Sequence, residues 1–112
     1  TDDHFHSSAF CHMTFTKQTI SKTMAELARR LGIARKEYVS LEKKAGCYAF
    51  ERYLTRELMK RSRTDRERDD WELEEAALEC IAAAEQQEMQ VLQAEMGRCE
   101  SLLEAAKRHA NS

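Results

Sequence analysis

Apolar residues recur along one stretch of this sequence at steps that alternate between four and three, without a break. The series consists of Ile20, Met24, Leu27, Leu31, Ala34, Tyr38, Leu41, Ala45 and Tyr48. This spacing places all nine side chains on one face of a helix that packs against another helix. A capping box of Thr23 and Glu26 lies near the start of the series. Residues 17–63 therefore predict a long coiled-coil-like helical segment.

The apolar pattern changes after Tyr48. It moves to Phe50, Leu54 and Leu58, with Met59 beside them. This shift predicts that the helix either contains a stutter at this point or restarts after Gly46.

A second helix is predicted from the capping box of Thr64 and Glu67 to about His109. Its apolar stripe consists of Leu78, Ile81, Met89, Leu92, Met96, Cys99, Leu103 and Ala106, with a weak stretch at residues 85–88. At 1.5 Å per residue this helix would be about 65–70 Å long.

Composition supports an all-α chain of one domain. The 112 residues include no proline and three glycines, and 34% of them are charged. No apolar run is long enough to span a membrane, and no phosphate loop, GxSxG elbow or HExxH motif is present. We therefore expect a non-catalytic protein without a cofactor.

Charge is divided between the two helical parts. Residues 17–63 carry thirteen Lys or Arg and five Glu, a net +8, whereas residues 64–112 carry five Lys or Arg and thirteen Asp or Glu, a net −8. Complementary charges of this kind favour an antiparallel hairpin that turns near residues 62–64. The alternative is that the basic segment binds phosphates of a nucleic acid.

Residues 24–42 resemble the helix-turn-helix of the phage-repressor family, with Ala28 between the helices and Gly32 at the turn. The resemblance implies that Arg35, Lys36 and Ser40 would face the major groove, with residues 64–110 as a dimerising coiled coil. A turn at Gly32 would bury Ile33, whereas a continuous helix would bury Ala34. The nine residues in heptad register favour the continuous helix.

Cysteine usage is sparse, and no two cysteines are close in sequence, which favours an intracellular protein. Cys47 and Cys80 are equally far from the proposed turn, so a hairpin would place them at the same level. They would then pack together as small apolar groups or form a disulfide.

The first sixteen residues carry no Lys or Arg and show no helical or strand period. We interpret residues 1–16 as an N-terminal arm that becomes ordered on another surface. Its histidines and Cys11 do not have the spacing of a metal site, so no metal is expected. The missing initial Met fits either its removal or the cleavage of a targeting segment.

A hairpin has one seam, so apolar residues outside that seam need another partner. The candidate partner-binding residues are Phe5, Phe10, Phe15, Ile33, Phe50, Trp71, Leu73, Val91 and Leu102. The aromatic residues Tyr48, Phe50, Tyr53 and Trp71 form either a local cap on the hairpin or an exposed anchor for a partner.

These features predict a helical scaffold or accessory subunit of a larger multi-protein assembly, of the mitochondrial or cytoskeletal kind. The alternative is the helix-turn-helix-like nucleic-acid module. A plain homodimer is a further possibility.

Overall fold

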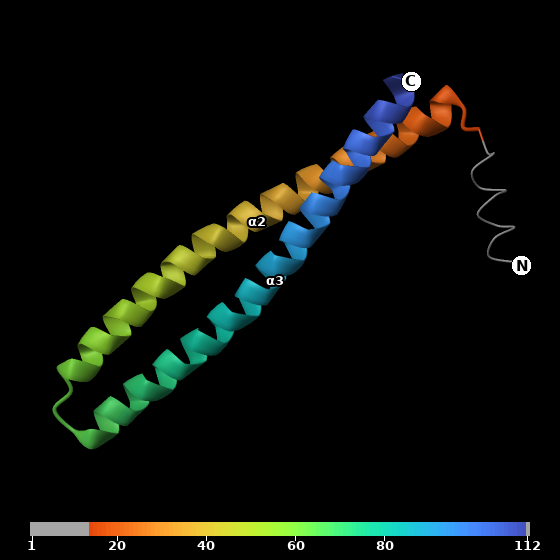
Figure 1. The fold of residues 1–112 in the computed structure, drawn as a ribbon. Coiled ribbons are helices and arrows are strands. Elements are labelled where there is room, and N and C mark those ends of the chain that lie inside the picture. The colour runs from red at the N-terminus through yellow and green to blue at the C-terminus, as the bar shows by residue number, and fades with distance from the viewer. Residues whose placement is uncertain (1–13, 112) are drawn as a thin grey trace, which may run out of the picture.

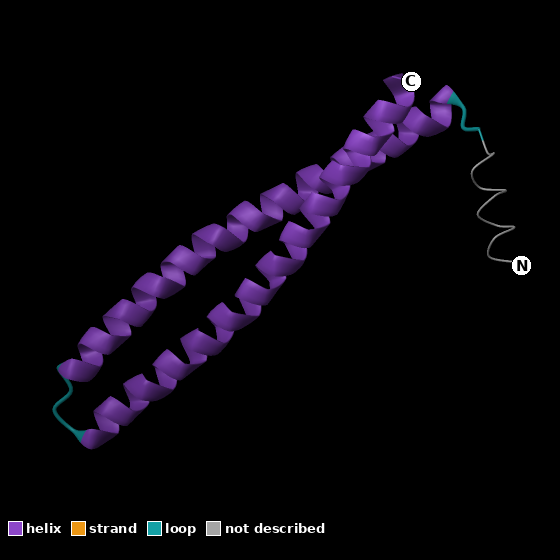
Figure 2. Ribbon diagram, viewed as in Figure 1, coloured by secondary structure: helices purple, strands orange, loops and turns teal. Residues whose placement is uncertain are grey.

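The computed structural model describes residues 14–111 and has two helices joined by a short turn. Helix α2 spans Lys17–Lys60 and helix α3 spans Asp65–Asn111. They run antiparallel as an extended hairpin with principal extents of 75 × 32 × 15 Å (Figure 1). The part of the chain described here contains helices and loop but no strand (Figure 2). The predicted all-α hairpin is therefore confirmed.

Helix α2 begins earlier than the capping box of Thr23 predicts. Its N-cap is Thr16, whose hydroxyl oxygen accepts a hydrogen bond from the amide N–H of Thr19 at 3.1 Å. Thr23 lies inside the helix, and its hydroxyl donates to the carbonyl oxygen of Thr19 at 2.9 Å. The predicted capping box at Thr23 is wrong because Thr16 caps the helix about two turns earlier, so Thr23 and Glu26 lie in its interior.

The turn and the N-cap at Thr64 form where the sequence predicts them, but the Glu67 carboxylate reaches back to the amide of Arg63 and not to that of Thr64. The amide N–H of Glu67 donates to the Thr64 hydroxyl at 3.1 Å, and the amide N–H of Arg63 donates to the Glu67 carboxylate at 3.1 Å. These bonds satisfy amides that have no partner within the helix. Helix α3 therefore begins directly after a turn of only four residues, 61–64, which holds the two helices antiparallel.

The nine-residue apolar series of α2 forms the seam with α3. Each of its members is buried or half-buried. Two buried clusters hold the helices together. One contains Ala34, Leu41, Met89 and Leu92, and the other contains Leu27, Leu31 and Cys99. Both clusters lie in the half of the hairpin that is far from the turn.

Helix α2 passes through Gly32 without a turn. Ala34 is 3% exposed and Ile33 is 45% exposed, as a continuous helix requires. The helix-turn-helix geometry is therefore not formed. The second helix of that motif would need Ile33 as a core residue, but Ala34 faces Leu92 and Met89 instead.

The seam of α3 follows the same alternation of four and three. It passes through Leu78, Ala82, Glu85, Met89 and Leu92, all of them buried or half-buried. Ile81, which was expected in the stripe, is exposed. The expectation was wrong because the heptad step from Leu78 leads to Ala82 and turns Ile81 away from α2.

Near the turn, the seam of α2 keeps the heptad register, whereas the apolar residues of the sequence leave it. Arg52 and Met59 are half-buried and Thr55 is buried, at steps of four, three and four from Tyr48. There is no stutter or restart, because the rigid helix carries its register onward from the packed half. The apolar stripe that begins at Phe50 is therefore exposed, since Phe50 lies about 200° around the helix from Tyr48.

Candidate functional site

The half of the hairpin next to the turn has polar side chains in its seam and two aromatic side chains exposed outside it. In its seam, the Thr55 hydroxyl donates to the carbonyl oxygen of Glu51 at 2.8 Å. The buried Nε of Arg52 has no hydrogen-bond partner among the described residues. The apolar residues of this seam are the buried Leu78 and the half-buried Tyr48, Met59 and Trp71. None of them belongs to the two buried clusters, and this half of the hairpin also has exposed apolar side chains.

The aromatic patch, which we define as Phe50 and Tyr53, lies on the outer surface of α2. The side chains are 60% and 57% exposed, and their rings stack with centroids 6.3 Å apart and an interplanar angle of 14°. Tyr48 and Trp71 are half-buried at seam positions instead. Two of the four aromatic residues therefore lie in the seam, as a local cap would require, and two are exposed, as an anchor for a partner would require.

The predicted partner-binding residues lie on several sides of the rod. Phe15, Ile33, Phe50, Leu73, Val91 and Leu102 are exposed. Trp71 is half-buried, and Phe5 and Phe10 lie outside the described residues. The sequence interpretation did not include Leu54, Leu58 and Ile81 among the exposed residues. Continuing the heptad beyond Tyr48 would have found Leu54 and Leu58.

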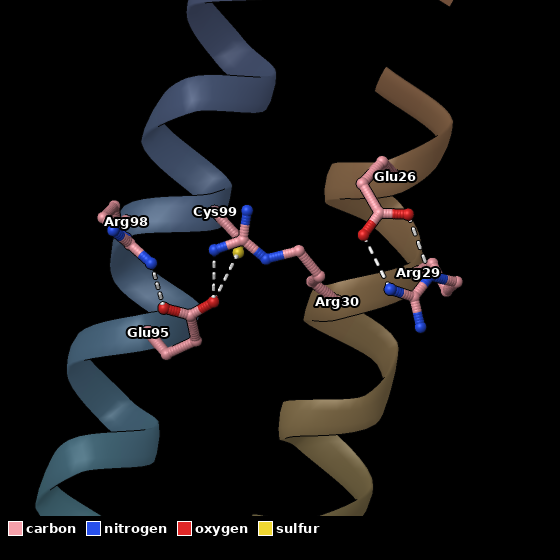
Figure 3. Close-up of polar contacts among 6 residues, drawn as sticks. All are labelled: Glu26, Arg29, Arg30, Glu95, Arg98 and Cys99. Atoms are coloured by element: carbon pink, nitrogen blue, oxygen red, sulfur yellow. Dashed lines mark hydrogen bonds and ion pairs between the residues drawn. The ribbon is translucent and has the colours of Figure 1, made fainter. Parts of the chain in front are cut away.

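Charged side chains join the two helices beside the seam, as the division of charge predicts. Arg30 donates to a carboxylate oxygen of Glu95 at 2.6 Å, and Arg98 donates to the other oxygen at 2.5 Å (Figure 3). The buried thiol of Cys99 lies 3.6 Å from the same carboxylate. Arg35 pairs with Glu100 at 3.3 Å and Arg56 with Glu75 at 2.6 Å. These pairs fix the register of the two helices.

Hydrogen bonds from Arg30 and Arg98 hold the pKa of the Glu95 carboxyl below its ordinary value near 4.5. A carboxyl with a lowered pKa in the folded state stabilises the fold above its unfolded pKa, and this contribution is lost as the pH falls through the folded value. We expect Glu95→Gln to lower the free energy of unfolding at neutral pH. The difference from the unchanged protein should shrink as the pH falls below 4.5. Urea unfolding at a series of pH values measures both effects.

A matched control for this experiment is Glu104→Gln, which changes an exposed glutamate of α3 for which we find no ion pair within the described residues. Its unfolding free energy should follow that of the unchanged protein at every pH. A constant difference between Glu95→Gln and the unchanged protein across the acid range would contradict the proposed role of the Glu95 charge.

The residues expected to contact nucleic acid have different surroundings. Arg35 is engaged with Glu100 of α3, at the edge of the seam. Lys36 and Ser40 are exposed on α2. The three side chains therefore do not lie together on a separate recognition helix.

Cys47 and Cys80 are both exposed, and both are free thiols. Neither the disulfide nor the buried pair forms. The two residues lie beside heptad seam positions instead of on them, and their side chains point away from the interface between the helices. Their equal distance from the turn places them at the same height along the hairpin, but their side chains lie on different sides of it.

A cavity of about 220 Å³ lies at the end of the hairpin far from the turn. Phe15 and His109 are on its wall, with their rings edge to face and their centroids 6.5 Å apart. The remaining wall consists of Thr19, Ile20, Thr23 and Ala106. The surface of this wall is mostly apolar, so the cavity suits an apolar group.

No group of metal-binding side chains is found among residues 14–111, and no helix in that range is long and apolar enough to cross a membrane. Comparisons with protein families, curated proteins and solved structures find no match for this chain.

Proposed function

We propose that this protein is a non-catalytic helical scaffold or accessory subunit that acts by packing against other proteins in a larger assembly. The observation that carries the proposal is the exposed aromatic patch, which lies outside a seam of mixed polar and apolar residues. Aromatic side chains are the usual anchors of protein interfaces, because they bury a large area at a small cost in conformational entropy. The rings of Phe50 and Tyr53 stack on each other, so they present one continuous apolar surface.

The ion pairs between the two helices are consistent with the same role. Ion pairs such as Arg30–Glu95 stabilise one register of the hairpin and keep the patch at a fixed distance from the chain ends. We expect the assembly to be intracellular, in a mitochondrial or cytoskeletal complex, since cysteines without close pairs favour a reducing compartment.

The test is sedimentation of the tagged full chain from a gentle lysate of its own cells, with and without nuclease. We expect the unchanged protein to migrate in a large, nuclease-resistant particle. Phe50→Ser with Tyr53→Ser should move it to small species, because the anchor of the interface is lost. Val39→Ser is the matched control, since Val39 is an exposed apolar residue of the same helix outside the patch.

Two results would contradict the proposal. A small species for the unchanged protein would mean that no large assembly exists. Retention of the patch variant in the particle would mean that another surface makes the contact.

The second candidate is a nucleic-acid-binding module that contacts phosphates through α2. The observation in its favour is a row of exposed cations at seven-residue intervals on the outer surface of α2, which includes Lys22, Lys36 and Lys43. Release of the particle by nuclease would support it. Lys36→Glu should then weaken salt-dependent binding to DNA, and it would leave a protein assembly unchanged. Lys36 is a cleaner choice than Arg35, which also pairs with Glu100.

A further inference from the structure

A second surface of the rod carries exposed aliphatic side chains between charged ones, and it is distinct from the aromatic patch. Six aliphatic side chains that are between 40% and 68% exposed define this aliphatic face. They are Ile33, Leu54 and Leu58 of α2 and Ile81, Val91 and Leu102 of α3. They are more than half of the large hydrophobic residues exposed in the described part of the chain.

These six residues share one side of the hairpin. The Arg30–Glu95 pair bridges the helices on that side, and Ile33 lines the same cavity as this pair. Side chains seven residues apart share a face of a helix in heptad register, as do those four apart. Steps of seven lead from Ile33 to Leu54 and from Glu95 to Leu102 and Ile81. Steps of four add Leu58 to Leu54 and Val91 to Glu95.

The aliphatic face extends along most of the rod. Ile33 and Leu58 alone are about 38 Å apart along the axis of α2. The ion pairs between the helices place Ile81 between the levels of these two residues, and they place Leu102 beyond Ile33 toward the chain ends. A face of this length fits another long helical rod better than a short peptide.

The surface also has hollows that suit side chains from such a rod. A cavity of about 190 Å³ opens on the aliphatic face, with the small side chain of Ala34 beside Ile33 and Leu92. A small residue at a seam position leaves a hole that a side chain of a neighbouring helix fills in a helical bundle.

Charge indicates which rod fits. Helix α2 is basic and α3 is acidic, so a second copy of this chain offers each helix a partner of opposite sign. If two hairpins stack on their aliphatic faces with their turns at the same end, a two-fold axis along the rods sets α2 of each copy against α3 of the other. Stacking with the turns at opposite ends would set α2 against α2 and α3 against α3, which repel each other.

One buried acidic group is consistent with this arrangement. Oxygen Oε2 of Glu85 is buried and has no hydrogen-bond partner among the described residues. Glu85, Glu88 and Lys44 line one cavity and therefore share a level. In the stacking with the turns together, Lys44 of the second copy would lie opposite Glu85 and bring it a cation.

We propose that two copies of this chain pack on their aliphatic faces, with their turns at the same end, as an antiparallel four-helix bundle. The helices of one hairpin cross in the half far from the turn (Figure 1), as the helices of a supercoiled bundle do. The aromatic patch stays outside this interface and remains free for another protein.

The test is the mass of the purified full chain by sedimentation equilibrium over a range of concentrations. We expect twice the 13.0 kDa of one chain. Leu54→Lys with Ile81→Lys should give a monomer with unchanged helix content by circular dichroism. If that pair lowers the helix content, Val91→Lys replaces it. The matched control is Val39→Lys with Leu73→Lys, which adds the same charges at exposed apolar residues outside the face and should leave the dimer intact.

Orientation needs a separate measurement. A spin label is attached to an Arg63→Cys variant in which Cys11, Cys47 and Cys80 are replaced by serine and the buried Cys99 is kept. It reports the distance between the two turns. We expect a distance well under half of the 75 Å rod. A distance near the full length would overturn the proposed orientation, and a monomer at every concentration, or a dimer that survives the face variants, would overturn the interface. A monomer would leave the proposed function intact, because the lysate experiment tests the aromatic patch.

Discussion

Replacement of Ala34 by aspartate is expected to unfold the hairpin. Ala34 is buried between Leu41, Met89 and Leu92. A carboxylate at this position would lose its hydration without gaining a partner, which costs about 3–5 kcal/mol. Domains have about 5–15 kcal/mol of stability, and a hairpin with a single seam lies at the low end of this range. We therefore expect a large loss of helical signal in far-ultraviolet circular dichroism at room temperature, or a urea midpoint close to zero.

The matched control is Ser40→Asp, which places the same charge at an exposed position of the same helix. Its unfolding free energy should stay within about 0.5 kcal/mol of that of the unchanged protein. The comparison also separates the continuous helix from the helix-turn-helix, in which position 34 is not in the core. A variant Ala34→Asp that melts like the unchanged protein would contradict the packing described here.

Replacement of all three glycines by alanine is expected to raise the melting temperature by about 10–20 °C. Gly32, Gly46 and Gly97 all lie within helices, and none has a positive φ. A Cβ atom added at any of them would meet no other atom within 4 Å. Each alanine removes a helix-propensity cost of about 0.8–1 kcal/mol, which gives about 2–3 kcal/mol for the three.

Thermal unfolding followed by circular dichroism measures this effect. The matched control is Ala94→Gly at an exposed position of α3, which should lower stability by about 1 kcal/mol. A lower melting temperature for the triple variant would contradict the open space beside the glycines. It would mean that another chain lies against them.

The fold could be predicted from the sequence where the apolar pattern and the heptad register agree. From Ile20 to Tyr48 the same residues satisfy both, and the predicted seam is confirmed position by position. The predicted N-cap at Thr64 is also confirmed, since its hydroxyl accepts a hydrogen bond from the amide N–H of Glu67. The start of α2 was predicted too late because Thr16 and Thr23 both suit an N-cap, and local sequence does not rank them.

Beyond Tyr48 the apolar pattern and the heptad register disagree. The prediction of a stutter or restart relies on the apolar pattern. The structure keeps the register, since leaving it would require the rigid helix to overwind or underwind. The same choice explains why Ile81 was placed in the seam. The exposed stripe from Phe50 to Leu58 was thus visible in the sequence, but its role as a surface depends on the long-range packing of Ala34, Leu41 and Met89. To predict the ion pair between Arg30 and Glu95, one must know which residues of the two helices lie at the same height along the rod. The net charges of the two segments do not give this information.

The most tightly packed part of the hairpin lies far from its turn, so a long loop must close before the strongest contacts form. Leu41 and Met89 are about 50 residues apart, and closing such a loop costs about 1.4 kcal/mol more than closing one of ten residues. The seam near the turn contains neither of the two buried clusters, so closing the short loop first gains less apolar burial. The chain therefore does not gain from zipping up from the turn. We therefore expect the encounter of the distant halves, and not closure of the turn, to limit the rate of folding.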